Sequence, residues 1–339
     1  MPTPRRIAVL GAGSWGTALA IHLSAIGHAV GLWARDAAHA NRMRAERANA
    51  RYLPGRPFPP GLTPTDRLVE VVTPQVDLVL FAVPSHATRE MAQQVAALNV
   101  PGLPELALVA AKGIEVDSLE TMEHVVAQEL PALRGRVAVL GGPSFADEVA
   151  QGQPTTVVVG CRDRTSANRV QHAISGGRFR AYVTDDVAGV ELGGTYKNVI
   201  AVAAGIGDGA GYGQNARAAL ITRGLAEMSR LAVAMGAKEE TLSGLAGLGD
   251  LVLTCTGGLS RNRRVGLALG QGRTLDHVLA QMGMVAEGVR NTKSVYQLGQ
   301  RHRVELPIVE TMHDILYDGL SIEDAAQALL RRTLKGERG

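Results

Sequence analysis

One lysine in this sequence stands inside a long apolar run with helical spacing. Lys197 lies in the segment LGGTYKNVIAV, residues 192–202. Burial disfavours a charged ammonium group, so we expect a lowered pKa and a lysine that can accept and donate a proton. The alternative is a lysine whose stem packs in the core while its ammonium group reaches water.

Other polar groups follow apolar runs that end at glycine-rich loops. Lys112 stands in AAKG, residues 110–113, just past one such run, and Gly142, Pro143 and Ser144 follow the next. If these runs are parallel strands, their carboxyl ends share the sheet edge at which ligands bind. Lys112, Gly142 and Ser144 are therefore candidate ligand-binding residues. The alternatives are a surface lysine and an ordinary turn.

Two further polar sites lie in the second half of the chain. Asp250 is a charged residue inside the apolar segment GLGDLVL. This context predicts a buried carboxylate with a charged partner, for which Lys197 is one candidate. The alternative is a helix N-cap. Ser260, Arg261 and Asn262 follow a glycine pair. Hydroxyl, guanidinium and amide donors in that arrangement suit a phosphate group. The alternative is a solvated basic helix start.

Residues 11–16, GAGSWG, form the pattern G-x-G-x-x-G between an apolar run and a helical one, which is the context of a dinucleotide site. Gly11 allows the tight turn, Gly13 lets a pyrophosphate approach the backbone, and Gly16 lets the helix pack closely on the sheet. The phosphates would meet N–H groups at the helix N-terminus. An ordinary glycine turn and an S-adenosylmethionine-binding fold are the alternatives.

Past the next apolar run, an acidic residue normally binds the ribose hydroxyls of the cofactor. This chain has Arg35 there, followed by Asp36. Arg35 suits the 2′-phosphate of NADP, and the alternative is a solvated surface arginine. The sequence therefore predicts NAD or NADP as the cofactor without deciding between them.

These residues need elements that bring strand ends together, and the first half of the chain supplies them. Apolar runs predict strands over residues 5–10, 29–34, 77–83, 106–110 and 137–140, and helical spacing predicts helices over 14–26, 87–98 and 119–130. Alternating strands and helices imply right-handed crossovers. We therefore predict an α/β fold with a Rossmann-type, doubly wound, mainly parallel sheet.

From about residue 186, helical spacing continues and strand alternation nearly vanishes. We expect helices over residues 190–206, 216–235, 274–282, 292–302 and 308–317, then a last helix over 325–330 that a capping box at Ser321 and Asp324 opens. The predicted organisation is a dinucleotide-binding domain (1–185), an all-helical substrate-binding domain (186–332) and a charged tail (333–339).

The composition excludes several classes of protein. With 46% hydrophobic and 20% charged residues the chain is globular, and a net charge of +3 with 4% aromatic residues argues against a general nucleic-acid binder. Cys161 and Cys255 form no metal-ligand pattern, so we expect no metal and a reducing cytoplasm. The uncharged stretch over residues 7–34 contains five glycines, which disfavours a membrane span or targeting segment.

Taken in order, the motifs resemble those of bacterial NAD(P)-dependent glycerol-3-phosphate dehydrogenases over nearly the whole chain. They are GAGSWG (11–16), AAKG (110–113), GGPSF (141–145), LGGTYKNVIA (192–201), NARAALITRGLAEMS (215–229), GLAGLGDLVLTC (244–255), SRNRR (260–264), VAEG (285–288) and RNT (290–292). The resemblance implies interconversion of dihydroxyacetone phosphate and sn-glycerol 3-phosphate with NAD or NADP. It also implies a role in supplying glycerol 3-phosphate for phospholipids.

The resemblance further implies a set of site residues. The family's nucleotide contacts fall on Ser14, Trp15, Arg35, Lys112, Ala146, Arg261, Val285 and Glu287. Its substrate contacts fall on Lys112, Gly142, Ser144, Lys197, Asp250, Ser260, Arg261 and Asn262, with Lys197 as the proton acceptor.

Two other classes of function stay open beside this one. A related dehydrogenase of a hydroxy acid or sugar acid would need a receptor for a carboxylate instead of a phosphate. A non-catalytic NAD(P)H sensor would have no use for Lys197. We expect a small-molecule phosphate substrate, no nucleic acid and no integral membrane segment, with a homodimer as one possible assembly.

Overall fold

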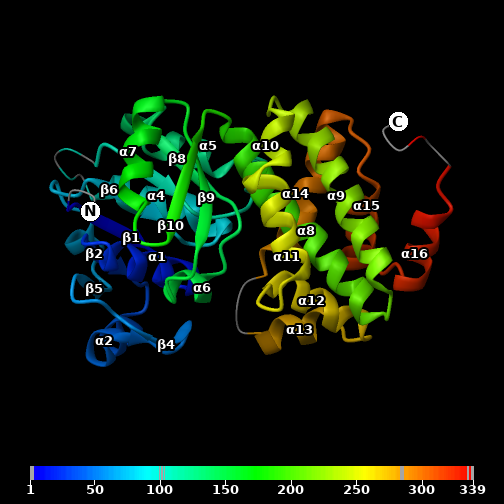
Figure 1. Cartoon of the computed structure of the whole chain (residues 1–339), viewed down its shortest axis with the longest axis horizontal. Coiled ribbons are helices and arrows are strands. Elements are labelled where there is room, and N and C mark those ends of the chain that lie inside the picture. The colour runs from blue at the N-terminus through cyan, green and yellow to red at the C-terminus, as the bar shows by residue number, and fades with distance from the viewer. Residues whose placement is uncertain are drawn as a thin grey trace. The chain divides into compact units, whose positions relative to one another are not determined.

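The structure is a computed structural model that describes residues 4–98, 100, 102, 104–282, 286–333 and 336 (Figure 1). The chain forms two compact units: Met1–Gly194 with Ala237–Asp250, and Thr195–Gly236 with Leu251–Gly339. This division differs from the predicted boundary after residue 185, because Val187, Val190 and Ala246 pack into the same core as the sheet. The predicted boundary between a dinucleotide-binding and a substrate-binding domain is a statement about function, and it stays a prediction.

A mainly parallel sheet organises the first unit. In the described residues its eight strands lie in the order β10-β9-β8-β7-β6-β1-β2-β5, and only the β8–β9 pair is antiparallel. The strands are β1 (Arg6–Leu10), β2 (Ala29–Trp33), β5 (Leu62–Thr65), β6 (Leu78–Phe81), β7 (Ala107–Val109), β8 (Val137–Gly141), β9 (Thr155–Gly160) and β10 (Phe179–Thr184). The predicted fold class and five predicted strands are confirmed, while β5, β9 and β10 were not predicted.

The residues of β1 show why helices cover both faces of this sheet. Ile7 and Val9 belong to one apolar core and Ala8 and Leu10 to another, because successive side chains of a strand point to opposite faces. The first core includes residues of α1 (Ser14–Ala25) and α7 (Arg164–Ile174). The second includes residues of α4 (Thr88–Ala97), α5 (Met122–Glu129) and the start of α8 (Val187–Gly209).

Shorter elements complete the first unit. They are the antiparallel pair β3 (Ala48–Asn49) and β4 (Leu53–Pro57), the helices α2 (Ala37–Glu46), α3 (Leu68–Val71), α6 (Ala146–Ala150) and α10 (Glu239–Ser243), the 3₁₀ turns η1 (Ser85–Ala87) and η2 (Pro131–Leu133), and the π-helical turn η3 (Leu245–Gly249). Gly27 follows the end of α1 with φ +102°, a conformation that is typical of a glycine at a helix C-terminus.

The described residues of the second unit are helical, which confirms the predicted all-helical second part. Besides most of α8, its helices are α9 (Gln214–Ala234), α11 (Asp250–Thr256), α12 (Arg261–Gly270), α13 (Leu275–Met282), α14 (Glu287–His302), α15 (Pro307–His313), the π-helical turn η4 (Asp314–Asp318) and α16 (Ile322–Leu330). Ser321 caps α16, since its Oγ accepts from the Asp324 N–H at 3.1 Å. Most of the predicted tail lies outside the described residues.

No helix in the described part of the chain is both long enough and apolar enough to cross a membrane. The uncharged stretch over residues 7–34 instead forms β1, α1 and β2, with its glycines at turns and close contacts.

Candidate active site

The glycine-rich turn between β1 and α1 has the backbone geometry that its pattern predicts. Gly11 has φ +115°, and a Cβ there would lie 2.8 Å from the carbonyl oxygen of Ala82. A Cβ on Gly16 would collide with the carbonyl of Gly11, whereas a Cβ on Gly13 would meet no atom within 4 Å. Gly11 and Gly16 therefore serve the turn and the packing, and the space beside Gly13 is open.

The start of α1 fits the pyrophosphate of a dinucleotide. Gly13 is the N-cap, no side chain caps the helix, and its first turn holds no acidic residue. Such an N-terminus favours an anion through its N–H groups and its dipole. The indole Nε1 of Trp15 is buried and has no hydrogen-bond acceptor within the described chain, and the Ser14 hydroxyl donates to the Tyr52 carbonyl at 2.7 Å.

Asn49 of β3 contacts this turn, and the sequence analysis missed it. Its fully buried amide donates to the carbonyl of Ala12 at 2.9 Å and to the hydroxyl of Thr17 at 2.8 Å. Its Oδ1 accepts from the Tyr52 N–H at 3.2 Å. Asn49 thereby ties the glycine turn to the β3–β4 segment. A single buried asparagine in a two-residue strand gives no periodic signal, so it could not be found without the fold.

Arg35 and Asp36 follow the end of β2, and Asp36 caps the next helix. Arg35 is exposed, and Asp36 is the N-cap of α2, where its Oδ1 accepts from the N–H groups of Ala38 and His39 at 2.9 and 3.2 Å. These backbone hydrogen bonds lower the pKa of Asp36. Both side chains are exposed, but the Asp36 carboxylate caps α2, so Arg35 is the candidate for binding a ligand at this strand end.

Lys112 is held at the ends of β7 and β8 by three polar groups. Its Nζ donates to Asp250 Oδ2 at 2.8 Å and to the carbonyl of Gly142 at 3.0 Å, and lies 3.4 Å from Ser144 Oγ. The side chain of Lys112 is 16% exposed and that of Asp250 is 1% exposed. The structure thus brings together four of the residues that the sequence predicted for the substrate: Lys112, Gly142, Ser144 and Asp250.

Asp250 has a partner that the sequence analysis did not consider. Its carboxylate pairs with Lys112 within the first unit, and its pairing with Lys197 stays a prediction. Asp250 itself has helical φ and ψ of −72° and −32° at the start of α11, directly after the π-helical turn η3. The alternative interpretation of Asp250 as an N-cap is therefore wrong.

In the second unit, Lys197 is buried on α8 beside a network of asparagines. Lys197 is 6% exposed, which agrees with its apolar sequence context. The neighbouring Asn198 accepts through Oδ1 from Asn262 Nδ2 at 2.8 Å, and Asn262 Oδ1 accepts from the Gly288 N–H at 3.0 Å. Asn262 therefore joins α12 to α8 and α14. Asn198 was not predicted as a site residue, although it adjoins Lys197.

Arg261 begins α12 in a partly buried position. Burial lowers the pKa of its guanidinium, and the nearby carboxylate of Glu287 opposes that shift. Ser260 is the N-cap of α12, with its Oγ accepting from the Arg263 N–H at 3.2 Å. The segment does begin a helix and is basic, but Ser260 and Asn262 are buried, so it is not the solvated helix start of the alternative interpretation. Arg261 remains a candidate phosphate ligand.

Two predicted nucleotide contacts remain. Ala146 is the first residue of α6 and packs against the first apolar core. Val285 lies outside the described residues.

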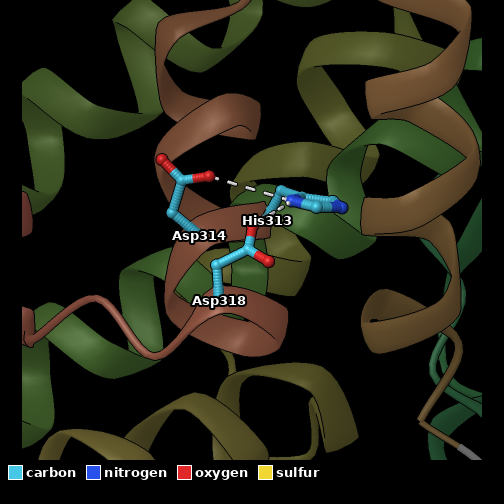
Figure 2. A group of neighbouring side chains, drawn as sticks. All are labelled: His313, Asp314 and Asp318. Carbon is cyan, nitrogen blue, oxygen red and sulfur yellow. Dashed lines mark hydrogen bonds and ion pairs between the residues drawn. The ribbon is translucent and has the colours of Figure 1, made fainter.

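In the described chain, one cluster of three side chains brings atoms that could bind a metal close together. Figure 2 shows Asp314 and Asp318 of η4 beside His313, and the carboxylate oxygens lie 3.8 and 3.1 Å from its Nδ1. The imidazole stacks on Tyr296 with a centroid distance of 4.1 Å. These contacts describe a histidine that two carboxylates and an aromatic ring hold in place. The expectation of no metal stays a prediction.

Comparison with known proteins gives matches over nearly the whole chain. The family model described as NAD-dependent glycerol-3-phosphate dehydrogenase N-terminus matches residues 6–167, and the C-terminus model matches residues 186–327.

Two curated relatives and one solved structure are similar to this chain over almost their full length. Glycerol-3-phosphate dehydrogenase [NAD(P)+] of Desulfotalea psychrophila is 50% identical, with 98% of each chain covered. That of Oleidesulfovibrio alaskensis is 51% identical, with 98% of this chain and 100% of the relative covered. The crystal structure of glycerol-3-phosphate dehydrogenase from Coxiella burnetii matches with a TM-score of 0.91 at 44% identity, covering 98% of this chain and 99% of that one.

Proposed function

The chain belongs to the NAD-dependent glycerol-3-phosphate dehydrogenase family, and we propose how its residues divide the work of that family's reaction. It is an NAD(P)-dependent oxidoreductase that interconverts dihydroxyacetone phosphate and sn-glycerol 3-phosphate, and so provides glycerol 3-phosphate for phospholipid synthesis. The assignment of roles to single residues is the proposal.

For the cofactor, we propose that the turn of Gly11, Gly13 and Gly16 holds the pyrophosphate at the start of α1. NAD(P)H, when bound, supplies the hydride. The further nucleotide contacts that we propose are Ser14, Trp15, Arg35, Lys112, Ala146, Arg261, Val285 and Glu287. The open space beside Gly13, the uncapped helix and the unsatisfied indole N–H of Trp15 support this assignment.

For the substrate phosphate, we propose Arg261 as the main ligand, with Ser260 and Asn262 beside it. A planar guanidinium forms two parallel charge-assisted hydrogen bonds with a phosphate. Partial burial strengthens such bonds, because water competes less for the donors. The fixed start of α12, with its N-cap at Ser260 and its Asn262 bonded to Asn198 and Gly288, supports a rigid receptor.

For the proton, we propose Lys197. Reduction of the ketone leaves negative charge on the carbonyl oxygen, and Lys197 Nζ donates a proton to that oxygen. In the direction of alcohol oxidation, the neutral amine accepts the proton of the hydroxyl group. Its charge also stabilises the developing oxyanion, and low exposure increases that stabilisation.

Lys112 and Asp250 complete the proposed assignment. Asp250 fixes the ammonium group of Lys112 at the ends of β7 and β8, where Gly142 and Ser144 also lie. A charge held in this way can bind an anionic substrate without first being ordered. We therefore propose that Lys112, Gly142, Ser144 and Asp250 contribute to substrate binding, and we propose the same role for Lys197, Ser260, Arg261 and Asn262.

One observation carries this proposal furthest. Within the second unit, the Asn198–Asn262 hydrogen bond joins α8 and α12 directly beside Lys197 and Arg261. The proposed proton donor and the proposed phosphate ligand are thus the sequence neighbours of the two asparagines that form this buried bond. A nucleotide sensor would not need both, and a hydroxy-acid dehydrogenase would use the cation for a carboxylate instead of a phosphate.

The activity is tested with purified protein, NADH or NADPH, and dihydroxyacetone phosphate, by following the loss of reduced-cofactor absorbance. We expect turnover with dihydroxyacetone phosphate and very little with either dihydroxyacetone or a 2-keto acid. Preference for the keto acid would support the rival dehydrogenase class, and cofactor binding without any turnover would support the sensor.

We also propose a cytoplasmic location, absence of nucleic-acid binding and a homodimer. Two buried free cysteines and a net charge of +3 support the first two of these. Light scattering after gel filtration tests the third, since a dimer has twice the mass of the 35.7 kDa chain.

A further inference from the structure

A nearly buried aspartate in the second unit holds two arginines from different helices. Asp208 lies near the end of α8, and its Oδ2 accepts from Arg263 of α12, from Nε at 2.9 Å and from Nη2 at 2.6 Å. Arg217 of α9 donates through Nη1 to both carboxylate oxygens, at 3.1 and 3.2 Å. The side chains of Asp208, Arg263 and Arg217 are 11%, 19% and 20% exposed. The carboxylate therefore joins three helices at one point.

Arg263 belongs to the basic run that begins α12, but its direction differs from that of Arg261. Residues two apart on a helix project about 200° from each other around the axis. The guanidinium of Arg263 is bonded to Asp208, so Arg261 leaves the helix on another side. The run thus contains one arginine committed to the protein and one that we assign to the substrate phosphate.

The two helices that Asp208 and Arg263 connect touch through their backbones. A Cβ on Gly205 of α8 would collide with the carbonyl of Arg263, and a Cβ on Gly266 of α12 would collide with the carbonyl of Val202. Gly209 and Gly270 make equally close approaches one turn further along. The first turn of α12 is therefore seated on α8 and fixed by side-chain bonds at two places, Asn198–Asn262 and Asp208–Arg263.

We propose that Asp208 is a positioning residue for the substrate phosphate. Through Arg263 it fixes the rotation and position of the first turn of α12, and so the direction of the Arg261 guanidinium. It also keeps the Arg263 guanidinium paired, so that this second cation does not compete for the phosphate. The inference rests on the proposed role of Arg261 as phosphate ligand.

The test uses Asp208→Asn in the full-length protein. The amide keeps the size of the side chain but loses the charge that pairs with both arginines. We expect the KM for dihydroxyacetone phosphate to rise by about tenfold, because a displaced ligand binds the phosphate less well. The KM for NADH is expected to stay within about twofold of the wild-type value, because Arg261 is only one of several proposed nucleotide contacts, and Asp208→Glu is expected to restore part of the loss.

Two further variants separate positioning from general stability. Glu305→Gln removes an exposed carboxylate that pairs with Arg332 in the same unit, and it serves as the matched control with unchanged kinetics. Arg263→Gln should reproduce the KM effect of Asp208→Asn, and the double variant should be no worse than the more impaired single one, because both changes break one bond. Arg263→Lys provides a milder break if Asp208→Asn does not fold.

The outcomes are distinct. A rise in KM confined to dihydroxyacetone phosphate, with a melting temperature close to that of the control, supports the positioning role. An unchanged KM, or an equal rise in the KM of both substrates that follows the melting temperature, overturns it. Wild-type protein without dihydroxyacetone phosphate reduction would instead contradict the proposed function, and this inference with it.

Discussion

At the scale of single residues, two buried carboxylates each hold a cation from another element. Asp250 of α11 fixes Lys112 after β7, and Asp208 of α8 fixes Arg263 of α12. Burying an unpaired charge is costly, so these pairs hold the polar groups of the site in one geometry. Arg261 is the partly buried cation whose assigned role is to bind a ligand. Substitutions of Arg261 and Arg35 therefore test the assignment at this scale.

Replacement of Arg261 by alanine should weaken substrate binding far more than cofactor binding. Loss of a bidentate phosphate ligand predicts a strongly raised KM for dihydroxyacetone phosphate, and a loss of about 2–4 kcal/mol in kcat/KM. Steady-state kinetics measures the change, with Arg264→Ala as the control for loss of an exposed charge on the same helical turn. Unchanged kinetics with dihydroxyacetone phosphate would remove Arg261 from the phosphate site.

Replacement of Arg35 by alanine should penalise NADPH selectively. If Arg35 meets the 2′-phosphate, the wild type uses NADPH at least as well as NADH, and the variant loses about 1.5–3 kcal/mol with NADPH alone, which is the value of a hydrogen bond to a charged group. KM values for both cofactors give the answer. Arg67→Ala, at a mainly exposed arginine of the same unit, controls for net charge. An equal change in KM for both cofactors, or no change in either, would mean that Arg35 does not bind the 2′-phosphate.

At the scale of elements, two buried histidines join α1 and the start of β2 to the end of α7. His22 Nε2 donates to the carbonyl of Ile174 at 2.8 Å and His28 Nε2 to that of Ala173 at 2.7 Å, which satisfies carbonyls at a helix C-terminus. His28 Nδ1 accepts from the Arg5 N–H at 3.1 Å, so His28 must be neutral. Burial lowers the pKa of both imidazoles below the usual 6.5.

These lowered pKa values predict a loss of stability in mild acid. The folded state binds fewer protons than the unfolded state below pH 6.5, so the contribution is complete above that pH and falls as the pH drops toward the folded-state pKa values. Each proton taken up on unfolding adds a slope of up to about 1.4 kcal/mol per pH unit.

Denaturant unfolding between neutral pH and pH 5 measures this slope. We expect it to be smaller for His22→Asn/His28→Gln than for the wild type. His172→Gln, at an exposed histidine of α7, should leave it unchanged. Equal slopes for the wild type and the double variant would show that these histidines are not responsible.

Some helices and strands could be predicted from the sequence, and others could not. Strands with continuous apolar runs between glycines, such as β1 and β8, and long helices such as α8 and α9 were predictable because hydrophobic periodicity records burial. β9 and β10 were not predicted, although TTVVVG in β9 is a strand-like run. The strand–helix alternation continues there through α6 and α7, and what departs from the predicted pattern is the antiparallel pairing of β8 and β9. The π-helical turn before Asp250 left no sequence signal, hence the wrong N-cap alternative.

At the scale of the whole molecule, sequence motifs located the candidate site but not its internal bonds. Lys112 and Asp250 are 138 residues apart, so only tertiary packing pairs them. Glycine weakens a helix, so the sequence alone gives no favourable reason for the glycines of α8 and α12. In the structure they permit the close contact between the two helix backbones that places Asn262 beside Asn198. The compact units also divide α8 after Gly194, within an uninterrupted helical pattern that could not mark a boundary.

In the proposed reaction, this oxidoreductase moves a proton through the buried Lys197. The measurement is steady-state turnover of Lys197→Met with dihydroxyacetone phosphate and NADPH, together with cofactor fluorescence and a melting curve. Lys293→Met, at an exposed lysine of α14, is the control. Methionine fits an apolar helix face, so we expect a folded variant that still binds NADPH but whose kcat falls by about 10²–10⁴, the usual effect of losing a positioned acid–base group. A near-normal kcat in the folded variant would contradict the claim and move the role to Lys112.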